Sequence, residues 1–293
     1  MTRSENTRWA APALVFNAFT WGVSWWPFRA LQERGLHPLW ATAFTYAIAC
    51  VALAIWRPAA VRELLRTPSL WILVLASGCT NAAFNWGVTI GDVVRVVLLF
   101  YLMPLWALLL ARALLAEALG AKAALRVALA FAGALVVLWP DAGGWPLPRQ
   151  LSDWLGVAGG FSFALNNVML RREAARTPGA RALAMFFGGA AVAALLAGAL
   201  HLQGMVPGLP APAPGWIAGA FVMGLLFLVG NLALQYGATR LPANATAVIM
   251  LTEVVFASGS ALLLGAGTLD AQLAAGGAAI VGAALLAARR GAH

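Results

Sequence analysis

The sequence has very little charge. Of its 293 residues only 10% are Asp, Glu, Lys or Arg, while 62% are hydrophobic. A soluble globular protein has about 25% charged and roughly 45–50% apolar residues. A chain of this composition cannot cover a water-facing surface, which excludes an ordinary soluble enzyme, a disordered chain and a disulfide-rich secreted module. The net charge of +9 comes from scattered Lys and Arg residues. It indicates basic membrane loops, with no nucleic-acid partner.

Cysteine and histidine are also scarce. Cys50 and Cys79 lie in apolar runs and form neither a disulfide framework nor a metal pattern. The three histidines lie at the ends of apolar runs or in the tail, and the sequence has no HExxH, CxxC or GxxxxGK[ST] motif. We therefore expect no metal, no cofactor and no enzymatic activity. A membrane-embedded enzyme is the alternative from another class, and it would need two or more ionisable groups at one depth.

The sequence does contain long apolar runs. The hydrocarbon core of a bilayer is about 30 Å thick and is crossed by about 20 apolar residues of helix. Ten runs have about this length, and the loops between them are too short for an extramembrane domain. We predict an all-α integral membrane protein with ten transmembrane helices. The predicted spans are residues 9–29, 38–56, 70–90, 93–112, 121–140, 151–171, 180–202, 215–238, 243–264 and 270–288.

Lys and Arg are distributed unevenly between the two sides of this arrangement. With the N-terminus inside, the inner segments hold all but four of the 19 Lys and Arg residues. Positive charge is retained on the cytoplasmic side of a membrane protein. We therefore predict that both termini are cytoplasmic and that the proline-rich connector 203–215 is outside. The four basic residues on the outer side are Arg29, Arg34, Arg95 and Arg149.

The second half of the sequence repeats features of the first half. Identical or similar residues stand 150 residues apart in the third and eighth predicted spans, and 142 residues apart in the first and sixth. An ordered series of matches at one separation is hard to explain by coincidence. The pairs are Asn81 and Asn231, Asn85 and Gln235, Trp86 and Tyr236, Gly87 and Gly237, Thr89 and Thr239, Trp106 and Phe256, then Trp21 and Phe163, Ser24 and Asn166, Arg29 and Arg171.

Each half of the chain holds five predicted spans, residues 1–149 forming the first repeat and 150–293 the second. Because five is odd, the second half enters the membrane from the opposite side. The repeats are therefore inverted about a pseudo-two-fold axis in the membrane plane. Such symmetry lets a central site open alternately to each side. It indicates a secondary transporter, since an enzyme, receptor or scaffold would not need matched halves.

Two short segments are similar to those of a known family. Leu102-Met103-Pro104-Leu105, with Glu117 beyond it, resembles the fourth span of EamA-type members of the drug/metabolite transporter superfamily, and residues 251–257 (LTEVVFA) resemble the ninth. Ala116, Val254 and Gly267 depart from the family pattern. Within the superfamily the chain looks closest to bacterial aromatic amino acid exporters. The resemblance implies a multi-pass protein of the bacterial inner membrane that exports amino acids and related metabolites.

Polar residues within the predicted spans indicate where a substrate binds. Such residues are costly in a membrane and usually face a bundle interior or a wet cavity; the alternative is that they bond across dry helix contacts. Amide, hydroxyl and aromatic groups, without a deep Lys, Arg or His, suit a small amphiphilic zwitterion better than a phosphorylated sugar. The predicted substrate-binding residues are Trp21, Ser24, Asn81, Asn85, Tyr101, Trp106, Phe163, Asn166, Asn231, Gln235 and Glu253.

Two residues leave more than one role open. Glu253 is the single deep acidic residue; it could couple export to proton entry, remain a neutral hydrogen-bonded acid, or pair with a substrate ammonium. Pro104 bends its helix, either as a static kink or as a hinge. The sequence predicts an amino-acid exporter that works by alternating access, with an exporter of another small metabolite as the alternative. Its partners are the small-molecule substrate and the lipid bilayer.

Overall fold

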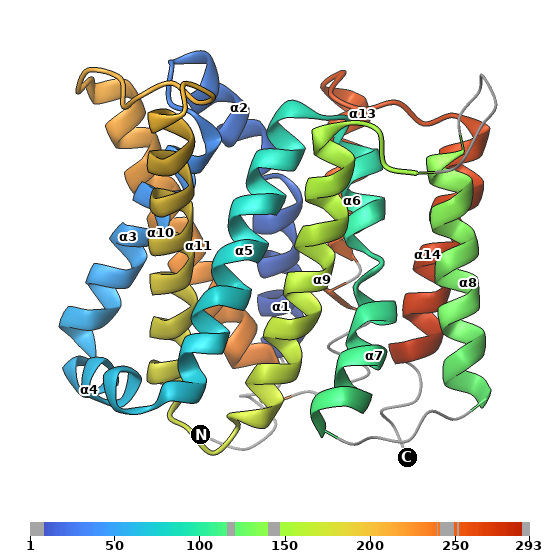
Figure 1. Ribbon diagram of the computed structural model, residues 1–293, viewed down its shortest axis with the longest axis horizontal. Helices are drawn as coiled ribbons and strands as arrows, with labels where there is room; N and C mark the ends of the chain where they lie inside the picture. Colours follow the sequence, from blue (N-terminus) through green and yellow to red (C-terminus); the bar gives the residue numbers. More distant parts are fainter. Residues whose placement is uncertain are drawn as a thin grey trace.

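The computed structural model describes residues 9–115, 121–139, 147–238, 240, 249–250 and 252–288. Within these ranges every regular element is a helix, and most helices run alongside one another (Figure 1). Four stretches are long and apolar enough to cross a membrane, namely Pro38–Trp56, Val93–Leu114, Pro178–Leu202 and Pro214–Leu234. The expectation of an all-helical membrane protein is confirmed. The count of ten spans stays a prediction.

With one exception, the helices fall on the predicted spans. Residues 243–248 and 251 of the ninth predicted span lie outside the described residues, as do parts of the loops and both termini. The helices are α1 (Ala10–Gly22), α2 (Trp25–Glu33), α3 (Pro38–Trp56), α4 (Pro58–Arg66), α5 (Pro68–Ile90), α6 (Val93–Phe100), α7 (Met103–Leu115), α8 (Ala121–Leu138), α9 (Leu151–Arg172), α10 (Pro178–Leu202), α11 (Pro214–Ala238), α13 (Thr252–Leu263) and α14 (Ala271–Ala288).

Two of the predicted spans are interrupted. The first is divided into α1 and α2 at residues 23–24, where the Ser24 hydroxyl donates to the Trp21 carbonyl over 2.8 Å. The fourth is divided into α6 and α7 at Tyr101-Leu102. Pro104 is therefore the second residue of α7, a position where its missing N–H removes no helix hydrogen bond. The expected bend is a break between two helices.

One helix was not expected from the sequence. Residues 58–66, predicted as a loop, form α4, which begins at Pro58 and buries Ala60 and Leu64. The Glu63 carboxylate accepts from the backbone N–H of Thr177 over 3.1 Å and from its hydroxyl over 2.6 Å. That hydroxyl hydrogen bond holds the pKa of Glu63 below its usual value. The bond ties α4 to the turn between α9 and α10.

The long helices can be divided into two groups that also share an extensive contact. The α1 bundle consists of α1, α3, α11 and α13; the α5 bundle consists of α5, α6, α7, α9 and α10. The two bundles meet along α3 and α10, while α8 and α14 pack on each other beside α6 and α7 (Figure 1). A site at the centre of the molecule is therefore lined by helices of both bundles.

The contacts between helices occur in matched pairs. Under the predicted repeat, the contact of α5 with α9 corresponds to that of α11 with α1, and the contact of α10 with α5 to that of α3 with α11. The pairs α3/α10 and α8/α14 each join two equivalent helices. Matched contacts of this kind are what a two-fold relation between the halves predicts. The inverted repeat itself stays a prediction.

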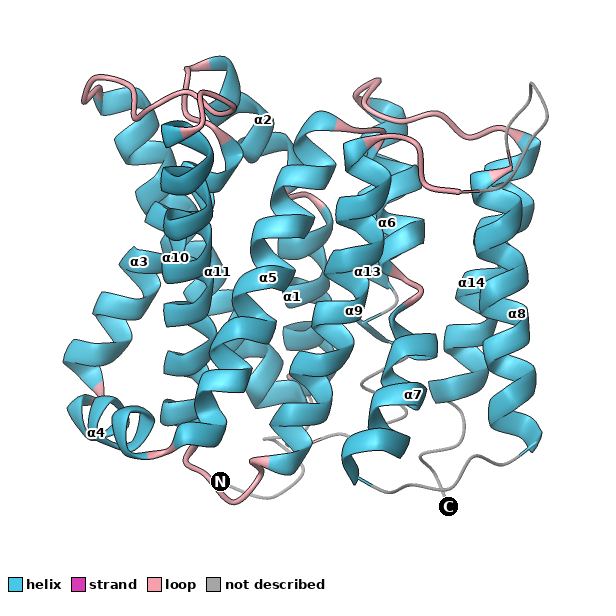
Figure 2. Cartoon of the chain, in the orientation of Figure 1, coloured by secondary structure: helices cyan, strands magenta, loops and turns pink. Residues whose placement is uncertain are grey.

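The connecting segments collect at two opposite ends of the molecule (Figure 2). The first, which we call the α2 end, carries α2, residues 203–213 and the loop 264–270; the second, the α4 end, carries α4 and the turn 173–177 (Figure 1). The arginines that the sequence analysis assigned to opposite sides of the membrane follow this division. Arg29 and Arg34 belong to α2 and its C-cap, whereas Arg57, Arg62 and Arg66 belong to α4 or flank it.

Glycines let the helices of the α5 bundle touch backbone to backbone. A Cβ added to Gly160 of α9 would lie 2.4 Å from the carbonyl oxygen of Phe100, the last residue of α6. A Cβ added to Gly188 of α10 would lie closer still to the Val74 carbonyl oxygen of α5. Real Cβ atoms do not approach this closely, so these positions require glycine. The helices that form this bundle are thereby fixed against one another.

Candidate functional site

A cavity of about 100 Å³ lies between the two bundles. Its volume is enough for several water molecules. The walls combine amides, hydroxyls and aromatic rings, and no Lys, Arg or His is among the described lining residues. The residues that line it are Asn17, Trp21, Tyr46, Ser77, Thr80, Asn81, Phe84, Phe100, Phe163, Asn166, Met185, Phe186, Phe227, Asn231, Leu234, Met250 and Glu253.

Six of the predicted substrate-binding residues line this one cavity, although they come from five different helices. The six are Trp21 of α1, Asn81 of α5, Phe163 and Asn166 of α9, Asn231 of α11 and Glu253 of α13.

The other predicted site residues lie elsewhere. The Ser24 hydroxyl donates to the Trp21 carbonyl at the break between α1 and α2. The Asn85 amide donates to the Thr42 hydroxyl over 3.1 Å. The ring of Trp106 packs edge-on against Phe161 with centroids 5.7 Å apart. The side chain of Gln235 lies outside the described residues. These residues do not line the cavity, so their direct role in binding stays a prediction.

Tyr101 reaches the cavity indirectly. It is buried at the break between α6 and α7, and its hydroxyl donates a hydrogen bond to the carboxyl of Glu253. Glu253 is the single carboxyl group among the described lining residues. The bond links the α5 bundle to the α1 bundle at the cavity wall. Tyr101 is therefore a positioning residue for Glu253.

Two amide oxygens in the cavity have no hydrogen-bond partner among the described residues. They are Oδ1 of Asn17 and Oδ1 of Asn166, and both atoms are buried. The Asn17 amide nitrogen does have a partner, since it donates to the Met250 sulfur over 3.6 Å. A buried acceptor without a partner costs about 1–3 kcal/mol. Together with the Glu253 carboxyl, these oxygens leave the cavity short of hydrogen-bond donors, which a ligand could supply.

Asn81, by contrast, is fully engaged with the protein. Its Nδ2 donates to the Ser77 carbonyl over 2.8 Å, and its Oδ1 accepts from the Tyr46 hydroxyl over 2.5 Å. The Tyr46 ring packs against Phe186 with centroids 6.0 Å apart, and a Cβ added to Gly189 would collide with the same ring. This network holds α3, α5 and α10 together where the bundles cross. Asn81 can face a ligand only as part of a rigid wall.

The aromatic walls are closely packed. Trp21 stacks on Phe227 with ring centroids 4.6 Å apart and planes 12° apart. On the facing wall, Phe100 contacts both Phe84 and Phe163, at 4.8 and 5.4 Å between centroids. Such faces can pack an apolar side chain or attract a cation. The sequence analysis did not name Phe227, although it stands four residues before Asn231 and so shares its helix face.

Residues related by the predicted repeat line the cavity from opposite sides. At a separation of 150 residues, Asn81 pairs with Asn231 and Phe100 with Met250, and at 142 residues Trp21 pairs with Phe163. Tyr46 and Phe186 each stand eight residues beyond the proline that begins their helix. Ser77 pairs with Phe227 and Phe84 with Leu234 at the separation of 150. The cavity therefore draws equivalent positions from both halves of the chain.

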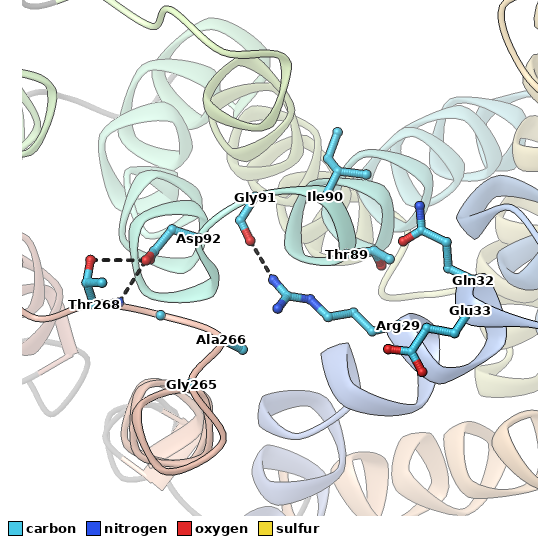
Figure 3. Close-up of a pocket in the computed structure, with 11 residues that line it drawn as sticks. Arg29, Gln32, Glu33, Thr89, Ile90, Gly91, Asp92, Gly265, Ala266 and Thr268 are labelled. Atoms are coloured by element: carbon cyan, nitrogen blue, oxygen red, sulfur yellow. Dashed lines mark hydrogen bonds between the residues drawn. The ribbon is translucent and has the colours of Figure 1, made fainter.

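A second, larger pocket opens at the α2 end. Its volume is about 470 Å³, and Figure 3 shows it between α2, the turn from α5 to α6 and the loop after α13. Charged groups of both signs line it, in contrast to the interior cavity. The lining residues are Arg29, Gln32, Glu33, Thr89, Ile90, Gly91, Asp92, Gly265, Ala266, Gly267 and Thr268.

Two hydrogen-bonded links, which we call ties, connect opposite sides of this pocket. Nη2 of Arg29 donates to the Val88 carbonyl over 3.1 Å and to the Gly91 carbonyl over 2.6 Å, which joins α2 to the end of α5. Asp92 caps α6 by accepting from the Arg95 N–H, and its second oxygen accepts from the Thr268 N–H over 2.8 Å. Both ties are drawn in Figure 3. They close the molecule between its bundles at the α2 end.

The fold and the site define a multi-pass membrane protein whose apolar helices enclose a partly polar central cavity. Residues 8–139 match the EamA-like transporter family, so the chain carries an EamA-like domain of the drug/metabolite transporter type. The predicted resemblance is confirmed at this level. The finer likeness to aromatic amino acid exporters stays a prediction.

A solved structure shows the same fold along the whole chain. It is a crystal structure described only as that of a protein, with a TM-score of 0.58 and 20% sequence identity, and the match covers 99% of each chain. At this level of identity the likeness concerns the fold alone. No curated protein matches the sequence.

Proposed function

We propose that this transporter exports amino acids, aromatic ones among them, and similar small zwitterions across the bacterial inner membrane by alternating access. The observation that carries the proposal is the interior cavity, which lies between two bundles and is lined by repeat-related residues of both halves. Inverted repeats around a central site are the arrangement that exposes the site to each side in turn. No described lining residue provides a cation for a phosphate.

The chemistry of the cavity favours an ammonium group as one part of the ligand. Oδ1 of Asn17, Oδ1 of Asn166 and the Glu253 carboxyl are acceptors that face the same cavity. An ammonium supplies three donors and a positive charge. The aromatic rings of Trp21 and Phe163 then pack the side chain of the substrate. Of the three roles open to Glu253, we propose the pairing with the substrate ammonium.

Reconstitution into liposomes tests the proposed function. The purified full chain is incorporated into vesicles that contain labelled phenylalanine, leucine or glutamate, and efflux is measured with and without a pH gradient. We expect efflux that is fastest for phenylalanine and slowest for glutamate, because the cavity offers aromatic walls and no cation. Vesicles without protein provide the control. The absence of amino-acid flux under both conditions would contradict the proposal and favour another metabolite or an enzyme.

Cysteine labelling tests the proposed orientation of the protein in the membrane. The excess of Arg and Lys at the α4 end supports the proposal that this end is cytoplasmic. In a background without Cys50 and Cys79, the exposed Ala213→Cys at the α2 end should react with a membrane-impermeant thiol reagent in intact cells. The equally exposed Ala174→Cys at the α4 end should react only after the cells are opened. The reverse pattern would contradict the proposed orientation.

A further inference from the structure

From the pocket at the α2 end we infer a second binding site, which takes the charged ammonium and carboxylate groups of the departing substrate. This inference rests on the proposed function. The pocket, of about 470 Å³, falls within the usual 300–1,000 Å³ of small-molecule sites. Its described lining residues include one cation, Arg29, and two carboxylates, Glu33 and Asp92. A zwitterion complements both signs of charge, whereas an ion of one sign would be repelled by part of the lining.

Arg29 has the geometry to bind a carboxylate. Its bonds to the Val88 and Gly91 carbonyls come from Nε and Nη2, and Nη1 has no hydrogen-bond partner among the described residues. Figure 3 shows the guanidinium reaching into the pocket from α2, with Glu33 near its stem and Asp92 beyond its head. Its Cζ also lies 5.2 Å from the centroid of the Trp25 ring, which steadies its orientation. Because the Arg29 guanidinium is held in place and Nη1 has no described partner, the Nη1 N–H groups can donate to a ligand.

The two carboxylates have different roles. Asp92 uses both oxygens on the protein, because it accepts from Arg95, the N–H of Thr268 and the hydroxyl of Thr268. Glu33 is exposed and has no hydrogen-bond partner among the described residues. Glu33 stands four residues after Arg29 on α2, so both side chains lie on one face of the helix. We assign the carboxylate of the ligand to Arg29 and its ammonium to Glu33.

Binding at this site would also loosen the closure of the α2 end. Arg29 joins α2 to the end of α5 through neutral carbonyl oxygens. A charged carboxylate forms hydrogen bonds roughly twice as strong as those of a neutral acceptor. A substrate carboxylate therefore competes with the carbonyls for the guanidinium, and the link between α2 and α5 weakens when the site is occupied. The site thus holds the substrate at the end where it leaves.

Inhibition measured separately from each side of the membrane tests the site. Vesicles with the full chain in one orientation exchange labelled phenylalanine, and unlabelled inhibitors are added to the α2 side or the α4 side. The inhibitors are phenylalanine, phenethylamine, which lacks the carboxylate, and phenylpropionate, which lacks the ammonium. For Arg29→Gln we expect about tenfold weaker inhibition from the α2 side by phenylalanine and phenylpropionate, with phenethylamine unchanged. Glu33→Gln should affect phenylalanine and phenethylamine instead.

Control variants separate binding from folding. Arg34→Gln, at the C-cap of the same helix and outside the pocket, should leave all inhibition unchanged. If Arg29→Gln does not fold, Arg29→Lys can replace it, because lysine keeps the charge without the planar fork. Arg29→Lys should weaken inhibition by phenylpropionate by a smaller factor. Glu33→Gln removes no described hydrogen bond and gives an independent result.

The outcomes separate this inference from the proposed function. Equal inhibition by all three compounds in wild type and variants, or equal changes on both sides, would overturn the second site while leaving export intact. A wild-type protein that exchanges no amino acid would contradict the proposed function itself.

Discussion

The interior cavity and the pocket at the α2 end differ in nearly every physical respect. The cavity is small, lies between close-packed rings and contains a single described carboxyl group, whereas the pocket is larger and has charges of both signs. Rigid helix contacts such as Gly160 against Phe100 surround the cavity, while the pocket is bounded by a loop and two helix ends. Under the proposed function, recognition of the substrate side chain and contact with water therefore occur in separate regions.

The largest expected effect concerns the charge in the cavity. Glu253→Gln keeps the shape of the side chain but removes the negative charge that we pair with the substrate ammonium. A hydrogen bond to a charged group is worth about 1.5–3 kcal/mol, so exchange measured at limiting substrate should fall by about 10- to 100-fold at every pH. Glu33→Gln should leave affinity measured from the α4 side unchanged. A Glu253→Gln variant that exchanges normally and loses only its response to a pH gradient would show proton coupling instead.

The second prediction concerns the rigid wall of the cavity. Gly160→Ala places a Cβ 2.4 Å from the Phe100 carbonyl oxygen, which is backbone and cannot turn aside. Overpacking of this kind costs about 1–3 kcal/mol, and thermal unfolding of the purified protein in detergent should show the loss. Gly198→Ala is the matched control, since it is also within a helix and nothing lies within 4 Å of its added Cβ. Equal stability of both variants would contradict a wall fixed by this contact.

The third and smallest prediction concerns the amide oxygens. Asn166→Ala removes an acceptor that has no partner among the described residues, so the protein loses no hydrogen bond of that atom. Affinity for phenylalanine should fall by about tenfold, while phenylpropionate, which lacks the ammonium, should bind as before. Asn85→Ala, which lies outside the cavity and bonds to Thr42, should alter stability rather than affinity. Equal losses of affinity for both ligands would show that Asn166 contributes to packing rather than to recognition of the ammonium group.

Much of the helix pattern could be predicted from the sequence, because apolar runs of about 20 residues are set by the thickness of a bilayer. The breaks at residues 23–24 and 101–102 could not, since apolar residues continue directly across each break. Helix α4 was not predicted, for a related reason. Its few buried residues, such as Ala60 and Leu64, form no long apolar run.

The polar residues of α5 show why only part of the site was predicted. Ser77, Asn81, Asn85 and Thr89 are spaced by four, and each such step turns about 40° beyond a full turn of a helix with 3.6 residues per turn. The stripe therefore winds around α5. Ser77 and Asn81 line the cavity, whereas Asn85 has turned toward Thr42 of α3. Tyr46 gave no signal at all, because it is one of several aromatic residues in an apolar run.

Under the proposed alternating access, the crossing of α3 and α10 at Tyr46, Phe186 and Gly189 is the point about which the two bundles rotate. Tyr46 stands about 12 Å along α3 from Pro38 and about 15 Å from Trp56, at 1.5 Å per residue. These two lever arms are nearly equal. If the bundles rock about this point by about 10°, each end of α3 moves by about 2–3 Å in opposite directions. Parting of the bundles at the α2 end and their approach at the α4 end are then one movement, and no separate latch is needed to keep both ends from opening together.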